Sequence, residues 1–283
     1  MHSSAPERRT RPPRRPEQSL RQEYHEFLLQ RIEEYKNGLG REEILAIGDE
    51  AVRELDASSE NQYLLTEVLV LEHVDRIIMR RLRLPAFPRW KRTHRALREA
   101  QRQPTHWGLD PDGLLVDYAL RLEQGDAVTV VGSRWLPAAL FIAANDAHVM
   151  LLDQDLGAVE AAEQRAVTER LAGRFDALVV QFGGWFPDVL PALAIVDPAA
   201  LAETPPRQRA AALDALQART RPGGVHLVIP AVQSKGVIPI APESLQRQYE
   251  GWQIVRRGRA RRGAGFAAIK PARQSDTASR ASD

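Results

Sequence analysis

The stretch from Asp126 to Asp155 is the part of this sequence that most constrains the fold. An apolar segment, Ala127 to Val131, ends at Gly132, a helix-like run follows, and a second apolar segment ends at Asp153. In α/β proteins a glycine after the first strand lets a ligand approach a helix N-terminus, and an acid after the second strand holds a ribose. The stretch therefore predicts the opening of a nucleotide-binding α/β unit.

The glycine pattern of this turn departs from the usual one. A GxGxxG or GxGxG motif is expected after the first strand, whereas the chain has Gly132 followed by Ser133, Arg134, Trp135, Leu136 and Pro137. Backbone that normally lies bare against a ligand would here carry side chains. The sequence consequently determines the fold better than the activity.

From His106 onward, strand-like and helix-like segments alternate, which indicates a parallel sheet with right-handed crossovers. Helices are expected near residues 112–122, 157–172, 206–219 and 243–249, with one more after Pro137. The expected strands are Ala127–Val131, His148–Leu152, Ala177–Gln181, Leu193–Val196 and Val225–Ile229. Two last runs, Trp252–Arg256 and Gly265–Ile269, predict an antiparallel hairpin at the sheet edge because their connection is short.

The segment before residue 106 has a helical pattern. A first helix is expected from Leu20 until Asn37 and Gly38, a second over Ile44–Leu55, and a third from a capping box at Ser59–Gln62 until Pro85. The fold class is thus α/β, a Rossmann-like doubly wound sheet with an N-terminal α-helical extension. The expected domains are a disordered basic arm (1–18), the helical extension (19–105), the sheet domain (106–272) and a disordered tail (273–283).

Composition narrows the classes of function. The chain has 283 residues, no cysteine, and seven histidines without a close HxxxH or HxH pair. Disulfides and thiolate chemistry are therefore excluded, and a zinc site is not expected. No apolar run approaches the roughly 20 residues of a membrane span, so the simplest expectation is a cytoplasmic protein that does not contact a membrane.

Arginines are unevenly placed although the net charge is only +2. They cluster in residues 8–15 and 256–262, and a third basic run covers residues 89–98. Such clusters can bind nucleic acid phosphates, but a solvated arm or hairpin is the commoner explanation. Nucleic acid is therefore a secondary candidate as partner.

Three segments carry a family resemblance over roughly residues 106–271. They are the RPGG turn at Arg221–Gly224 with the following VHLVIP, the segment PESLQRQYEGWQIV, and the terminal hairpin. Together they resemble class I S-adenosylmethionine-dependent methyltransferases, in particular the tellurite-resistance-like, small-molecule branch. The resemblance implies S-adenosylmethionine as cofactor and methyl transfer to a small molecule as activity.

The resemblance also implies a set of site residues, each following the end of a strand. The turn after the first strand would cradle the methionine part of the cofactor, the acid after the second strand would hold the ribose, and the end of the third strand would contact adenine. A residue after the fourth strand would face the methyl group as catalytic residue. In this sequence these positions are Gly132, Ser133 and Arg134, then Asp153 and Gln154, then Gln181 and Phe182, and finally Asp197.

Departures from the family pattern leave alternatives open. The family usually has an acid where this chain has Val130, and small residues at Arg134 and Leu136. Arg134 could pair with the cofactor carboxylate, or the turn could have lost the cofactor; Asp153 could also merely cap the following helix. The alternative functions are a catalytically inactive module that binds a protein partner, or itself, through the N-terminal helices, and an RNA-modifying or RNA-binding protein.

Overall fold

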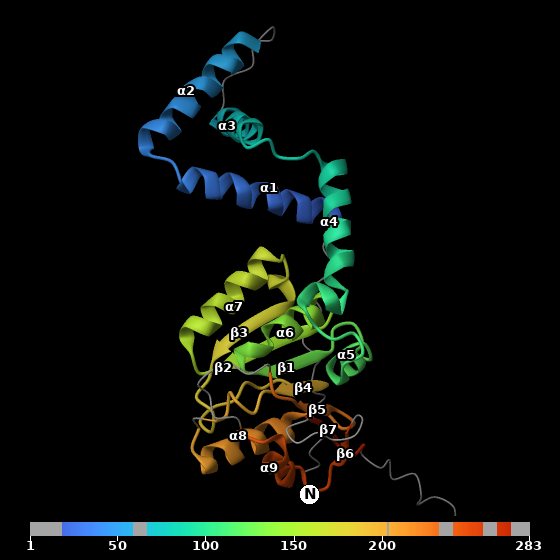
Figure 1. The fold of residues 1–283 in the computed structure, drawn as a ribbon. Helices are drawn as coiled ribbons and strands as arrows, with labels where there is room; N and C mark the ends of the chain where they lie inside the picture. The colour runs from blue at the N-terminus through green and yellow to red at the C-terminus, as the bar shows by residue number, and fades with distance from the viewer. Residues whose placement is uncertain (1–18, 59–66, 203, 232–239, 257–264, 273–283) are drawn as a thin grey trace, which may run out of the picture. The chain divides into compact units, whose positions relative to one another are not determined.

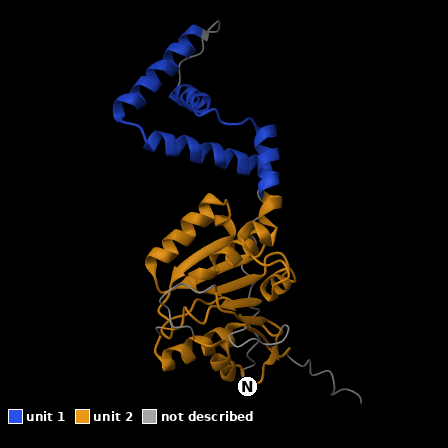
Figure 2. Ribbon diagram, viewed as in Figure 1, with its two compact units in different colours: residues 1–97 blue, residues 98–283 orange. Residues whose placement is uncertain are grey.

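The computed structural model describes residues 19–58, 67–202, 204–231, 240–256 and 265–272. The chain divides into two compact units, residues 1–97 (unit 1) and 98–283 (unit 2), shown in Figure 2. The expected arm, the capping box at Ser59–Gln62, the connection of the terminal hairpin and the tail lie outside the described residues.

Unit 1 is helical, as the sequence predicts. It contains α1 (Leu20–Asn37), α2 (Arg41–Ser58), α3 (Glu67–Arg81) and the start of α4 (Phe87–Gln101). The Ser19 side chain caps α1 by accepting the N–H of Gln22, and the helix ends at Gly38. One small cluster of buried side chains joins α1, α2 and α3: Ile32, Ile47, Ala51, Ile77 and Ile78.

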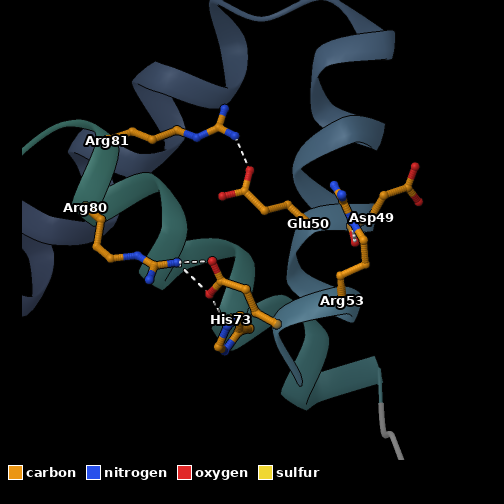
Figure 3. Close-up of polar contacts among 7 residues, drawn as sticks. Asp49, Glu50, Arg53, His73, Arg80 and Arg81 are labelled. Atoms are coloured by element: carbon orange, nitrogen blue, oxygen red, sulfur yellow. Dashed lines mark hydrogen bonds and ion pairs between the residues drawn. The ribbon is translucent and has the colours of Figure 1, made fainter. Parts of the chain in front are cut away.

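Polar contacts also join α2 and α3 (Figure 3). Glu54 on α2 accepts hydrogen bonds from His73 Nε2 at 2.8 Å and from the Arg80 guanidinium at 2.6 and 2.8 Å. Glu50 pairs with Arg81 in the same way. These hydrogen bonds, Arg80's first, lower the pKa of Glu54, so its carboxylate stays ionised and the pairs stay formed in mildly acidic solution.

Unit 2 is built on one seven-stranded sheet in the order β3-β2-β1-β4-β5-β7-β6 (Figure 1). Strands β1 to β5 are parallel, and β7 runs antiparallel to both β5 and β6. The strands are β1 (Ala127–Val131), β2 (His148–Asp153), β3 (Phe175–Val179), β4 (Leu193–Val196), β5 (Val225–Val228), β6 (Gln253–Val255) and β7 (Phe266–Ile269). The expected fold class is confirmed.

Alternate residues of the strands face two apolar layers. Val130 and Ile195 point toward the layer formed with α5 (Leu114–Ala119), α6 (Leu136–Ala144) and α7 (Leu156–Thr168). Val131 and Val196 point toward the layer with α8 (Pro206–Arg219) and α9 (Pro242–Gln246). Short 3₁₀ turns complete the unit at Pro104–Trp107, Ser133–Trp135, Ala172–Arg174 and Arg247–Tyr249.

Most expected element ends lie within three residues of the observed ones; α2, for example, extends beyond the expected Ile44–Leu55 at both ends. The third strand is the main correction. It was expected over Ala177–Gln181 but spans Phe175–Val179, because Phe175 already pairs with Val149 of β2. The helix expected to reach residue 172 ends at Thr168, since Arg170 takes a positive φ of 59° and turns the chain.

Candidate functional site

The strand order reverses between the carboxyl ends of β1 and β4, where open α/β sheets characteristically have a ligand crevice. From β1 the chain continues outward to β2 and β3, whereas from β4 it continues in the opposite direction to β5. Ligands of open α/β sheets bind at such a reversal, because the two connections leave in opposite directions. Gly132 follows β1 and Asp197 follows β4, so both stand at this point.

Gly132 allows the turn after β1 to lie directly on the turn after β4. Its φ is +106°, and a Cβ atom there would lie 2.8 Å from Ala200 Cβ and 3.0 Å from Asp197 Cβ. Both the backbone conformation and the space exclude a larger residue at this position. This one glycine is thus required for the close approach of the two turns.

Asp153 ties the end of β2 to the β1 turn. Its Oδ2 accepts the Ser133 N–H at 2.6 Å, and its Oδ1 accepts the Asp155 N–H at 3.1 Å. An ionised carboxylate has about four acceptor positions, so two remain for hydroxyl groups of a ligand. The alternative role of Asp153 as helix cap is wrong, because Asp155 caps α7 by accepting the Gly157 N–H.

Asp197 is a fully buried carboxyl group. Its Oδ1 accepts the Ala199 N–H at 3.0 Å. Its Oδ2 has no hydrogen-bond partner in the described part of the chain. Burial raises the pKa of Asp197, and the Asp153 carboxylate adds to this rise; the amides of Ala199 and Ala231 and the Arg134 charge oppose it. The Ala231 amide therefore lies near the Asp197 carboxyl group.

Arg134 and Trp135 follow in the same turn and differ in their contacts. The Trp135 indole N–H donates to the Ile229 carbonyl at 3.0 Å, which fastens the β1 turn to the end of β5. The half-buried Arg134 guanidinium makes no hydrogen bond or ion pair with any of the described residues. The turn therefore presents a free positive charge beside Asp197.

The remaining predicted site residues lie at the same edge of the sheet. Gln154 is exposed and donates to Thr204 Oγ1 at 3.4 Å. Gln181 follows β3 and is exposed. Its neighbour Val180 donates its N–H to the Asp153 carbonyl at 2.8 Å, which brings Gln181 close to Asp153. Phe182 has only 1% exposure and packs in the layer with α8, so its ring face is not open to a base.

The structure therefore joins Gly132, Ser133, Asp153 and Asp197 by direct contacts and leaves Phe182 outside the group. No sequence pattern indicates the contacts of Trp135 and Thr204, because the partner of each is distant in sequence. The described residues contain no group of three His, Asp or Glu side chains suited to a metal ion. Among them, no helix combines the length and apolar character needed to cross a membrane.

Comparisons with known proteins find similarity only among solved structures. No protein-family model matches the sequence. No curated protein matches it. The N-methyltransferase NodS from Bradyrhizobium japonicum WM9 is similar with a TM-score of 0.44 and 15% identity, over 56% of this chain and 92% of NodS.

Two further structures have similar values. An rRNA methylase from Streptococcus thermophilus has a TM-score of 0.42 and 13% identity, over 60% of this chain and 97% of its own. The glycopeptide N-methyltransferase MtfA has a TM-score of 0.42 and 12% identity, over 58% of this chain and 87% of its own. The likeness is distant in all three cases.

Proposed function

We propose that the crevice between β1 and β4 binds S-adenosylmethionine and that the protein transfers its methyl group to a small molecule. The observation that carries this proposal is the joined arrangement of three strand ends. Gly132 brings the β1 turn onto Asp197 of the β4 turn, and Asp153 of β2 holds the same β1 turn through Ser133.

Two features of the site fit the cofactor. The first is the position of the turn after β1 at the strand-order reversal, where ligands of open α/β sheets bind. The second is Asp197 Oδ2, a buried acceptor without a donor among the described residues. Buried polar atoms in native structures normally have a partner, and a ligand with donor groups supplies one.

Each residue has a distinct proposed role. Asp153 would accept the ribose hydroxyls through its two remaining acceptor positions, while its present hydrogen bonds keep the β1 turn in place. Gly132, Ser133 and Arg134 would lie along the methionine part, and Gln154 and Gln181 are the polar side chains next to the nucleoside. Phe182 has no role in this proposal because its ring is buried.

Catalysis in this proposal consists mainly of positioning. When bound, the cofactor supplies an activated methyl group on a sulfonium sulfur. The chain's part is to hold the acceptor atom in line with that methyl group, which removes much of the entropic cost of the reaction. Asp197 was expected as a catalytic residue, but its complete burial favours a role in binding over proton transfer with a substrate.

Calorimetry with S-adenosylmethionine and S-adenosylhomocysteine tests the proposal. We expect saturable binding that is weakened in Asp153→Ala. Asp176→Ala, which removes an exposed carboxylate from β3, should leave binding unchanged. Thermal unfolding of both variants checks that the sheet persists.

Failure of the wild-type chain to bind either nucleoside at high micromolar concentration would exclude the proposal. The fold would then serve the alternative function, a module that binds a partner without using the cofactor.

A further inference from the structure

Basic side chains are concentrated in one segment of unit 1. From residue 76 to residue 98 the sequence has nine arginines and lysines and no aspartate or glutamate. They are Arg76, Arg80, Arg81, Arg83, Arg89, Lys91, Arg92, Arg95 and Arg98. The nearest acids in sequence are Asp75 and Glu99, one at each end, although the whole chain has 39 basic and 37 acidic residues. A face that only contacts water normally mixes both signs of charge, so this segregation is unusual.

The arginines of α3 and those of α4 differ in their partners. On α3 they form ion pairs with acids of neighbouring turns and helices, for example Arg80 with Glu54 at 2.6 Å. On α4, Arg89, Arg92 and Arg95 are exposed. None of these three guanidinium groups has a hydrogen bond or an ion pair with a residue that the structure describes. Thus α4 presents three positive charges that no described acid neutralises.

The three arginines lie opposite the packed face of α4. Trp90 and His94 are only 3% and 4% exposed and mark the side of the helix that packs inside unit 1. At about 100° per residue, Arg92 points directly away from that side, and Arg89 and Arg95 lie about 60° to either side of Arg92. The rise from Arg89 to Arg95 is about 9 Å. Together they form a convex basic surface, which we call the α4 arginine face.

The chemistry of this face fits the phosphates of a double-stranded nucleic acid. Guanidinium groups bind phosphate with two parallel hydrogen bonds. A membrane or a protein partner needs exposed large apolar side chains at the contact, whereas this face has only Thr93 and Ala96 beside its arginines. Single strands stack on exposed aromatic rings, but the rings of Phe87 and Trp90 pack against Tyr24 of α1.

Thr93 distinguishes between the two kinds of duplex. Its exposed hydroxyl donates to the Arg89 carbonyl at 3.2 Å, which leaves its oxygen available only as an acceptor. Phosphate oxygens are acceptors and have no proton to give to Thr93. The 2′-hydroxyl of a ribose is a donor as well as an acceptor, and DNA lacks it. The combination of arginines with Thr93 therefore favours RNA over DNA.

We infer that the α4 arginine face binds the phosphate backbone of double-stranded RNA, with Thr93 accepting a hydrogen bond from a 2′-hydroxyl. Contacts to phosphate and sugar carry no base information, so this binding is independent of sequence. The inference goes beyond the proposed function, because it concerns unit 1 and uses no residue of the cofactor site in unit 2.

Fluorescence anisotropy of the full chain with a labelled RNA duplex of about 20 base pairs tests the inference. Wild-type affinity should fall steeply between about 50 and 200 mM NaCl. A triple variant with Arg89→Gln, Arg92→Gln and Arg95→Gln keeps good helix formers in α4. It should bind about 30-fold more weakly or worse at the lower salt concentration. Its slope of log affinity against log salt should be reduced by about one for each lost phosphate contact.

A second triple variant is the matched control. Arg41→Gln, Arg53→Gln and Arg207→Gln remove the same net charge from exposed positions on α2 and α8. If the α4 arginine face is the binding surface, this control should bind the RNA duplex within about threefold of the wild type. Far-ultraviolet circular dichroism checks that the helices persist in both triple variants.

A DNA duplex of the same sequence tests the part of Thr93. One additional hydrogen bond should make the wild type prefer RNA over DNA by about fivefold, and Thr93→Val should remove that preference. Thr168→Val is the control, because exposed Thr168 on α7 donates to the Gln164 carbonyl at 2.9 Å in the same way. It should leave the preference unchanged.

Several results would overturn the inference. They are failure of the wild type to bind the RNA duplex, equal RNA affinity of the wild type and the α4 triple variant, and equal wild-type affinity for RNA and DNA. Binding to phosphatidylserine vesicles that depends on the α4 arginines, without binding to RNA, would also overturn it. If the triple variant does not fold, Arg92→Gln alone decides, and it should weaken RNA binding about fivefold. Calorimetry with S-adenosylhomocysteine should be unchanged in the α4 variants, so these results leave the proposed function untouched.

Discussion

Unit 1 and unit 2 are stabilised in different ways. The sheet of unit 2 is buried on both faces, and its strands and helices form two extended apolar layers. Unit 1 has one small cluster around Ile47 and Ile77, bordered by ion pairs between α2 and α3 (Figure 3). Apolar burial contributes several kcal/mol per large side chain, whereas exposed pairs contribute little. Unit 2 is therefore the better support for a binding site, because burial on both faces of the sheet holds its strand ends in place.

Removing a large side chain from the sheet unit should have the greatest effect. Phe141 on α6 is 0% exposed within the layer that covers one face of the sheet. Phe141→Ala is expected to lower the free energy of unfolding by about 3–5 kcal/mol, through lost burial and the cavity left behind. Urea denaturation followed by circular dichroism measures this change in the free energy of unfolding.

Leu156→Ala is the control, since Leu156 is 58% exposed on α7. A loss below about 1 kcal/mol in Phe141→Ala would contradict the view that burial dominates unit 2.

The glycine at the crevice should be nearly as sensitive. In Gly132→Ala the new methyl group would be held at a positive φ and would overlap Ala200 and Asp197. We expect the free energy of unfolding to fall by about 2–4 kcal/mol. Gly125→Ala separates the two causes, because Gly125 also has a positive φ (+79°) but open space around it. In Gly125→Ala the free energy of unfolding should fall by only about 1–2 kcal/mol. Equal losses in both variants would show that the close approach of the two turns is not tight.

A buried histidine should make unit 2 sensitive to acid. His226 on β5 contacts Thr220 Oγ1 at 2.6 Å and the Tyr249 hydroxyl at 3.1 Å. Because the Thr220 hydroxyl donates to the Leu216 carbonyl, it accepts the His226 Nε2 proton, and Nδ1 accepts from Tyr249. Burial lowers the pKa of His226 from 6.5 to about 3, and the charge of Lys270 adds to the effect.

Acid should lower the free energy of unfolding because the unfolded chain takes up the proton. Between about pH 6.5 and 3, the unfolded chain binds a proton on His226 that the folded chain does not. The free energy of unfolding is therefore highest above pH 6.5 and decreases as the solution becomes more acidic. The wild type should lose roughly 2–3 kcal/mol more than His226→Gln between about pH 6 and 4. Denaturation at each pH measures the difference. Parallel pH profiles of the two chains would refute a neutral buried His226.

The polar contacts of unit 1 should have the smallest effect. Glu54→Gln removes the carboxylate that pairs with Arg80 and His73, at the exposed boundary between α2 and α3. We expect the smallest shift in melting temperature of the four changes. It should disappear in about 1 M NaCl, where the Debye length is roughly 3 Å. A shift as large as that of Phe141→Ala would reverse the comparison between the units.

Local sequence predicts much of the fold, for a physical reason. β1 and β4 have the expected ends because Gly132 and Asp197 stop the two apolar runs, and α8 has the expected start because Pro206 suits the first turn of a helix. β3 was placed two residues late because the apolar run through Val180 does not reveal where pairing with β2 begins. An apolar run shows that a strand is present, but it does not show which residues pair with the neighbouring strand.

The site is less predictable than the fold. The positions of Asp153 and Asp197 follow from the strand ends, but their partners Ser133 and Ala199 depend on turn geometry. The burial of Phe182 was not foreseen, because a residue directly after a strand can face solvent or the core. The contact of His226 with Tyr249 joins segments that only the folded sheet brings together.

A crystal structure of the chain grown with S-adenosylhomocysteine would show whether the cofactor binds where the strand order reverses. We predict the nucleoside at the carboxyl ends of β1 and β4, with its ribose on Asp153 and its methionine part along the turn after β1. Ligand density at another place, or no density here at saturating ligand, would show that the ends of β1 and β4 do not form the cofactor site.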